Sequence, residues 1–456
     1  MSAAVESLSR LWRDSLASLP ADTCEWIQSL RRDAFACFEE QGIPTRRLEE
    51  WKGTSFAPLA NMQFTRVGRN GRSGNAASAT RIASLDDVPT LVFVDGEFDS
   101  SASRLTNLPD GIRALPLAEV LCEEDPLLDG RLGTLTDPKI QPLVALQTAF
   151  LKDGAVIKIE QDVRIEEPIR LRFISTGSDH NTDDTDESSS SASFPRLLVV
   201  AEKNSSLTLL QEHLSTNPTA GFSAYVAELH LAEGAHIESL EIQSQDCSHI
   251  HFSSVHARLE RNAIFDSHVI STGNGLVRSE LAITLAEAGG QTTLCGLFLG
   301  RDSAHLDHFT TVDHAAEQCT SDEEYRGVLA GDSKGVFRGR VVVRPGAQKT
   351  DARQSNPNLL LSDRATVDTK PQLEIYADDI RASHGSTTGQ LDADALFFLR
   401  ARGIDAEIAK RMLTGAFAHG VVDRIKNEAL RDAARAYVDD SLRSLGNEIE
   451  MEQIGS

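Results

Sequence analysis

The chain has 456 residues, and Asp and Glu outnumber Lys and Arg by 68 to 45, which gives a formal net charge of −23 at pH 7. This balance disfavours nucleic acids and anionic membrane surfaces as partners, because both are bound through clustered Lys and Arg. No apolar run approaches the roughly 18 residues of a membrane span. The six Cys are scattered without a CxxC pair, which indicates reduced thiols in the cytoplasm rather than a disulfide framework. The N-terminus has no uninterrupted apolar segment before its charges, so no secretory signal is expected.

The first part of the chain is predicted to be helical and then mixed. Apolar residues at helical spacing predict an N-terminal helical region over 1–60, with one of its helices over about 22–41. Residues 61–150 are predicted to form a mixed α/β linker region, with a strand at 91–94 and a helix at 143–151.

An acidic, Ser-rich stretch at 176–193 interrupts the region that follows. All of its residues are polar or small, so it cannot bury enough apolar surface to offset the entropy of ordering. We therefore expect a disordered insertion within a larger domain over 151–390.

A loose repeat marks that larger domain. Each copy has an apolar residue, a turn of small or polar residues, and a second apolar or alternating stretch. The copies begin at Leu151, Leu231, Leu259, Leu285, Leu329 and Leu361. Short strands at a loose period, without long helices between them, predict stacked coils of a β-helix, or solenoid. A β-sandwich is the alternative, because strands with regular turns also build one.

The last region, 391–456, returns to helical spacing. Gly403 is placed to end a helix and Asp405 to begin the next one. We expect this C-terminal helical domain to cover the open end of the stack, whose unpaired strand edges need protection.

Several His and Cys residues could bind a metal. His305, His308, His314 and Cys319 have suitable chemistry, but His305 and His308 would point to opposite faces of one strand. The polar outer face of a sheet explains these four residues without a metal.

Cys247, His249 and His251 would share one face of a strand. Ile250 and Phe252 would then point into the core, and the face with Cys and His would point to solvent, a partner or a metal.

Two further patterns could mark a catalytic or binding site. His384 follows two carboxylates and precedes a Gly at a strand end, which is compatible with a site or with a hydrogen-bonded structural histidine. Ser333 lies in a GxSxG sequence, but strand residues follow it where a nucleophile elbow needs a helix. A turn between coils explains Ser333 better.

Several long motifs in one order resemble SufD-type proteins of the SufB/SufD family. Residues 42–52 resemble the family signature GxPTRKxExWK. Further matches lie at 335–339, 347–352, 358–362, 368–375, 377–379, 383–385 and 399–404. The likeness is dense over about 300–430 and thinner over 150–300.

The resemblance implies a mainly β fold, with a right-handed parallel β-helix core between N-terminal and C-terminal helical regions. It implies a non-catalytic scaffold in iron–sulfur cluster assembly, which pairs with a SufB-type subunit and binds a SufC-type ABC ATPase. By the same resemblance, His384 is the candidate ligand of iron or of a cluster at the SufB interface. The ATPase is expected on the C-terminal helices, with candidate contacts Phe397, Phe398, Arg402, Met412 and Phe417.

The resemblance also limits what the chain is expected to hold. No stably bound cofactor is expected in the isolated chain, only transient iron or a transient cluster in the complex. A homodimer is an alternative assembly. This chain departs from the family pattern at Ala382, where many relatives have Cys, and at Leu48, where a His is common.

Three alternatives remain open at this point. A SufB-like scaffold is disfavoured because the chain has Ser383 and Gly385 beside His384, where SufB has two Glu, and lacks its Cys near 366–368. The others are a β-helix carbohydrate-active enzyme and a stand-alone iron–sulfur protein.

Overall fold

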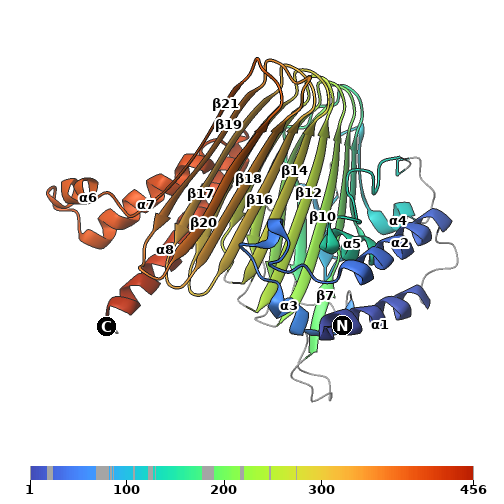
Figure 1. Ribbon diagram of the computed structural model, residues 1–456, viewed down its shortest axis with the longest axis horizontal. Helices are drawn as coiled ribbons and strands as arrows, with labels where there is room; N and C mark the ends of the chain where they lie inside the picture. Colours follow the sequence, from blue (N-terminus) through green and yellow to red (C-terminus); the bar gives the residue numbers. More distant parts are fainter. Residues whose placement is uncertain are drawn as a thin grey trace.

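The protein is a parallel β-solenoid with helices from both ends of the chain packed on its outside (Figure 1). The computed structural model describes residues 2–17, 24–67, 82, 85, 87–105, 108–121, 127–128, 130–176, 189–215, 220–245, 248–273 and 275–454. Within these residues, no helix is long and apolar enough to cross a membrane.

Two long sheets form the walls of the solenoid, and successive strands alternate between them. Among the described residues, the 11-stranded sheet, which we call sheet A, comprises β1 (Gln63–Val67), β4 (Ile112–Pro116), β5 (Gly154–Ile159), β7 (Ser189–Ser193), β8 (Arg196–Ala201), β10 (Gly221–Leu231), β12 (His249–Leu259), β14 (Leu276–Leu285), β16 (His305–His314), β18 (Lys334–Val343) and β20 (Thr366–Ile375). The 10-stranded sheet of the same residues, sheet B, comprises β2 (Thr90–Val94), β3 (Glu97–Phe98), β6 (Ile169–Ser175), β9 (Ser206–Ser215), β11 (His236–Ser244), β13 (Ile264–Ser271), β15 (Gln291–Gly300), β17 (Thr320–Leu329), β19 (Asp351–Leu360) and β21 (Arg381–Gly389).

The predicted solenoid is therefore confirmed, and the sandwich alternative is wrong. From β8 and β9 onward each strand pairs in parallel with the strand two places further along the chain, whereas sandwich sheets are antiparallel. The strand predicted at 91–94 is β2, and it enters a tight hairpin at Asp95 and Gly96, whose φ angles are 50° and 84°.

The repeat marks two kinds of turn at opposite corners of the coil. The turns from sheet A to sheet B begin at Leu231, Leu259, Leu285, His314 and Val343, with spacings of 28, 26, 29 and 29 residues. Leu329 and Leu361 instead belong to turns from sheet B to sheet A. Both kinds of turn contain residues with positive φ, so their sequences look alike. The predicted repeat mixed the two kinds, and this made its spacing irregular.

Part of the stretch predicted to be disordered is a strand. β7 is made of Ser and Ala, yet it pairs in parallel with β1 and with β10. The rest of the predicted insertion, 177–188, lies outside the described residues. The composition of β7 did not indicate a strand, because the strand is stabilised by pairing with β1 and β10, which are distant in sequence.

The N-terminal helices cover the outer face of sheet A. They are α1 (Ala3–Ala17), α2 (Glu25–Gln41), the 3₁₀ helix η1 (Glu49–Trp51), α3 (Ala57–Asn61), α4 (Leu117–Leu121) and α5 (Pro142–Ala149). Phe38 and Phe56 belong to the same buried cluster as Phe222 and Phe252 of the sheet. The predicted helices at 22–41 and 143–151 are thus α2 and α5.

The C-terminal helices are α6 (Ala393–Arg400), α7 (Ala406–Val422) and α8 (Glu428–Ile454), and Asp405 caps α7 by accepting a hydrogen bond from the Glu407 amide. α7 and α8 lie along the outer face of sheet B, whereas α6 packs against α7. Val422 and Leu430 share a buried cluster with Leu240 and Leu297 of the sheet. The expectation that these helices cap the open end of the stack is therefore wrong.

Arg278 anchors the N-terminal signature segment to sheet A. Its buried guanidinium lies 3.9 Å from the centroid of the Trp51 ring. Nη1 donates to Asp307 Oδ2 at 2.6 Å, and Nη2 lies 2.7 Å from Glu280 Oε1. Thr54 also donates to Asp307, so the segment is tied to two neighbouring strands, β14 and β16.

The interior of the solenoid contains titratable groups as well as apolar ones. Burial lowers the pKa of His308 to about 4 and raises the pKa of Glu323 to about 7. Glu323 accepts hydrogen bonds from Thr310 and Gln354, and the His308 ring lies against Tyr325. The interior therefore favours neutral histidine and a protonated carboxyl group near neutral pH.

Replacing the anchoring tryptophan, Trp51→Ala, is expected to lower the free energy of unfolding by about 3–5 kcal/mol, because it removes a buried aromatic ring and its cation–π contact. Urea unfolding and limited proteolysis of the N-terminal region would measure this. Trp26→Ala is the matched control, because Trp26 is 41% exposed. Equal effects of the two substitutions would contradict the anchoring role.

The buried His308 predicts a loss of stability in acid. Its pKa is about 4 in the folded chain against an ordinary histidine value of 6.5, so the unfolded chain binds the proton first as the pH falls. The advantage of the wild type over His308→Gln should therefore shrink by about 2 kcal/mol between pH 7 and pH 5. Urea unfolding of both proteins at the two pH values measures this, and a constant difference would contradict it.

Candidate functional site

The last coil leaves one end of the solenoid open. Among the described residues, β20 pairs only with β18, and β21 pairs only with β19. Each strand therefore presents a row of backbone groups at a free edge, and Figure 1 shows no helix across this end. An unprotected edge of this length is a template for pairing with another chain.

His384 lies at this open end, on the side of β21 that faces the interior. It is in register with the buried Gln354 of β19, which in turn pairs with Glu323 of β17. His384 is exposed because no further coil covers it. Of the two carboxylates before it, Asp379 pairs with Lys349.

Exposed apolar side chains gather on α6 and α7. Phe397 is 73% exposed and Phe398 is 54% exposed, while Ile408 and Met412 occupy one face of α7 at i and i+4. In Figure 1, α6 projects away from the solenoid. Exposed apolar residues grouped in this way are typical of interaction sites. The sequence prediction missed Ile408, whose spacing from Met412 could have indicated it.

The other two candidates on these helices act within the chain. The Arg402 guanidinium lies 3.3 Å from the centroid of the Phe398 ring, and its Nη1 donates to the Phe398 carbonyl at 3.0 Å. Phe417 is half-buried, and its carbonyl accepts a hydrogen bond from Arg326 of β17 at 2.6 Å. Arg402 thus orients Phe398, and Phe417 holds α7 to sheet B.

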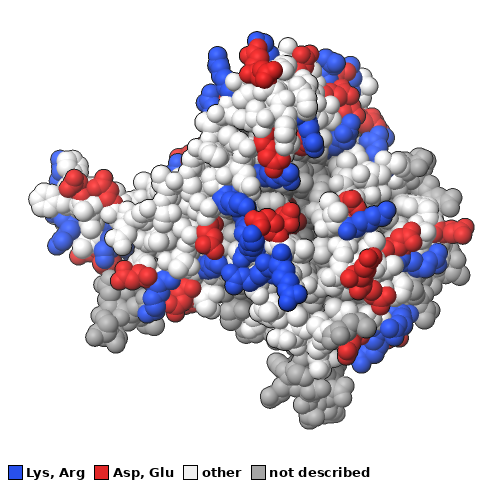
Figure 2. Space-filling model, in the orientation of Figure 1, with Lys and Arg blue, Asp and Glu red and all other residues white. Residues whose placement is uncertain are grey.

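The charged residues on the outer face of sheet A are largely paired. Figure 2 shows Lys and Arg gathered over the middle of this face with Asp and Glu among them. Lys370 contacts Glu49 at 2.8 Å, and Arg340 contacts Glu374 at 2.7 Å. The Lys and Arg residues of this face are therefore partly neutralised by nearby carboxylates and do not form a basic surface.

The four residues over 305–319 do not form a cluster. His308 and His314 are buried in the interior, so their expected place on an outer face is wrong. His314 Nε2 lies 2.8 Å from Ser321 Oγ, whereas His305 lies outside against Thr54. Cys319 is buried and forms a hydrogen bond with the Glu287 carbonyl.

The residues over 247–252 have the opposite orientation to the expected one. His249 and His251 face the interior, whereas Ile250 and Phe252 face outward under the N-terminal helices. Cys247 lies outside the described residues. Alternation predicted correctly which side chains share a face of β12. It could not show which face points to the interior, because both faces are buried.

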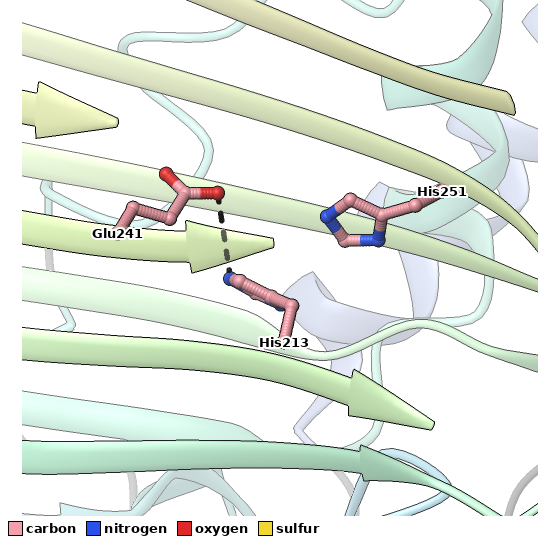
Figure 3. Close-up of side chains that lie close together, drawn as sticks. All are labelled: His213, Glu241 and His251. Atoms are coloured by element: carbon pink, nitrogen blue, oxygen red, sulfur yellow. Dashed lines mark ion pairs between the residues drawn. The ribbon is translucent and has the colours of Figure 1, made fainter. Parts of the chain in front are cut away.

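The inward orientation brings His251 to two residues that the sequence did not indicate. Within the described residues, His213 of β9, Glu241 of β11 and His251 form the one group of three potential metal ligands (Figure 3). Burial lowers the pKa of His213 to about 3 and raises the pKa of Glu241. No local motif marks these residues, because they come from three different strands.

Ser333 lies in the turn between β17 and β18, as expected. It is fully buried, and the chain continues into a strand rather than a helix. The geometry of a nucleophile elbow is absent at this position.

Family models match both parts of the chain. The model described as "SUF system FeS cluster assembly, SufBD core domain" matches residues 182–417, and that for "SufBD protein N-terminal region" matches residues 2–171. The first covers the coils from β7 onward together with α6 and most of α7.

Curated relatives match along most of their length. An iron–sulfur cluster assembly SufBD family protein of Synechocystis is 28% identical over 87% of this chain and 87% of its own. The iron–sulfur cluster assembly protein SufD of Escherichia coli is 28% identical over 88% of this chain and 90% of its own. The chloroplastic protein ABCI7 of Arabidopsis thaliana is 24% identical over 95% of this chain and 90% of its own.

Proposed function

We propose that this chain, which belongs to the SufBD family of the SUF iron–sulfur cluster assembly system, is a non-catalytic scaffold subunit in a complex with a SufB-type subunit and a SufC-type ATPase. Its role is iron entry and cluster formation at the interface with the SufB-type subunit. The complex acts in the cytoplasm, and ATP hydrolysis comes from the SufC-type partner.

The open end of the solenoid carries this proposal. β20 and β21 present free edges on both sheets, and a partner with strands of similar length can continue both sheets by parallel pairing. A SufB-type subunit is the proposed partner, and a second copy of this chain would form the alternative homodimer.

His384 supplies the chemistry at that interface. Its imidazole is exposed at the end of the interior, so it can bind iron as soon as a partner approaches. Exposure also suits a transient ligand, because iron or a cluster can leave again without unfolding of the chain. Ala382, two residues earlier on the same side, offers no thiol in this chain.

The helices α6 and α7 are the proposed site of the ATPase. Phe397, Phe398 and Met412 provide apolar contacts, and Arg402 fixes the ring of Phe398. Phe417 links α7 to β17, so a force on these helices reaches sheet B. Movement of the helices by the ATPase is thereby proposed to reshape the open end.

The alternatives are less well supported. Membership of the SufBD family favours cluster assembly over carbohydrate chemistry. A SufB-like role lacks the two Glu beside His384. Against a stand-alone iron–sulfur protein, Cys24, Cys295 and Cys319 are buried at separate places among the described residues.

The substitution His384→Ala is expected to leave the complex with both partners intact and to lower cluster formation several-fold. Co-purification followed by anaerobic reconstitution and visible absorbance measures both properties. Ser383→Ala is the matched control, because Ser383 is exposed on the outward side of the same strand. Undiminished cluster formation with His384→Ala would make His384 structural, and failure of the wild type to bind either partner would overturn the proposed function.

Replacing both exposed phenylalanines, Phe397→Ser with Phe398→Ser, is expected to change the free energy of unfolding by no more than about 0.5 kcal/mol. Affinity for the ATPase should fall by at least about tenfold, because apolar anchors dominate such interfaces. Isothermal titration calorimetry measures the affinity. Ile140→Ser is the control, because Ile140 is also 73% exposed but lies in the N-terminal half. Unchanged affinity for the ATPase would place its site elsewhere.

A further inference from the structure

The group of His213, Glu241 and His251 lies inside the solenoid and is shielded from solvent. His213 is 2% exposed, Glu241 is 3% exposed and His251 is fully buried. Their potential ligand atoms all lie within 4.8 Å of one another, and each comes from a different strand. Figure 3 shows the ring of His251 directed toward the gap between His213 and Glu241.

Two of the three ligand atoms lack a hydrogen bond. Nε2 of His213 and Nε2 of His251 are both buried without a hydrogen-bond partner. The first lies 3.5 Å from Glu241 Oε1, which accepts hydrogen bonds from Gln243 and Ser253. Buried polar atoms without partners are rare and costly, so two of them aimed at one point indicate a missing ligand.

The surroundings orient the rings. Nδ1 of His251 lies 2.7 Å from Ser223 Oγ, which fixes the ring and leaves Nε2 directed at the cluster. The ring of His213 stacks on Phe173 with centroids 4.9 Å apart and lies 4.6 Å from the Tyr225 ring. Both imidazoles are thus oriented by contacts that do not use Nε2.

The donor set matches one ligand chemistry. Two imidazole nitrogens and one carboxylate oxygen bind zinc in several enzymes and ferrous iron in the facial triad of oxygenases. Such donors lie about 2.0–2.2 Å from the ion, so the three atoms must approach one another by side-chain rotation.

The site also has room and a suitable charge. A cavity of about 10 Å³, which is space for one water molecule, adjoins the rings of His213 and His251. Within the described residues, no Lys or Arg forms an ion pair with Glu241. A cation would therefore meet one carboxylate that lacks a competing fixed positive charge.

We propose that His213, Glu241 and His251 form a buried site for one divalent transition-metal ion, ferrous iron or zinc, inside the solenoid. The site is distinct from His384, which lies on the last strand and is exposed. It departs from the sequence-based expectation that the isolated chain holds no metal, and it does not depend on the proposed partners.

Metal titration of the purified full-length chain tests this proposal. The protein is stripped with a chelator and titrated anaerobically with ferrous iron, zinc or cobalt, each alone. We expect about one ion per chain, with X-ray absorption showing two imidazoles and oxygen ligands. Because such sites bind zinc more tightly than ferrous iron in general, metal analysis of the protein as purified identifies the ion, and cobalt supplies a visible spectrum sensitive to the ligands.

Variants assign the bound ion to the site. Glu241→Gln keeps the shape of the side chain, and both it and His251→Ala should raise the dissociation constant by at least about tenfold. His308→Gln, which alters another buried histidine of the interior, and His384→Ala should leave it unchanged. Circular dichroism checks that each variant is folded.

Three results would overturn the proposal. They are no stoichiometric binding by the wild type, a bound ion without imidazole ligands, and loss of binding with His384→Ala while Glu241→Gln binds normally. None of them bears on partner binding or cluster formation, which are measured separately in the complex.

Discussion

Parallel strand pairing is the constraint on which the rest of the structure depends. Each coil satisfies the backbone groups of its strands only through the coils on either side, so a stack always has two ends with unmatched edges. At the start of the stack, β4 pairs antiparallel with β5, and the short β3 folds back antiparallel on β2. At the other end the described residues provide no such closure for β20 and β21. The C-terminal helices, which were expected to provide it, lie along the side of the solenoid instead, and this leaves the end available to a partner.

Helices cover the solenoid where a strand carries buried apolar residues on its outer face as well as on its inner face. On β12, Phe252 faces the N-terminal helices and Val255 faces the interior, and both are buried. The N-terminal segment is held by more than apolar packing, since Arg278 is enclosed by two carboxylates and by Trp51. Removing Arg278 would leave two buried carboxylates without their cation, and removing Trp51 would open the guanidinium to water, which explains why these side chains occur together.

The sequence sufficed to predict the class of fold but not the geometry of the interior. Periodic turns predicted coils, and helical spacing located α2, α5 and α7. Alternation could not show which side of β12 is inside, because Ile250 and His251 are both buried. The grouping of His213 with Glu241 depends on the register between coils, and the irregular spacing of the predicted repeat concealed that register. His384 was found through a motif, whereas its position at an open end follows only from the strand order.

Burial separates the two places where we propose that this chain binds a metal. His384 is exposed, so water, iron or a partner's ligand can reach it and leave it quickly. His213 and His251 are enclosed by coils on both sides, so an ion between them can exchange only when the solenoid opens locally. An ion held inside would also stabilise the coils that supply its three ligands, because it binds the folded chain and not the unfolded one. The same ligand chemistry therefore suits cargo at the end of the stack and a resident ion within it.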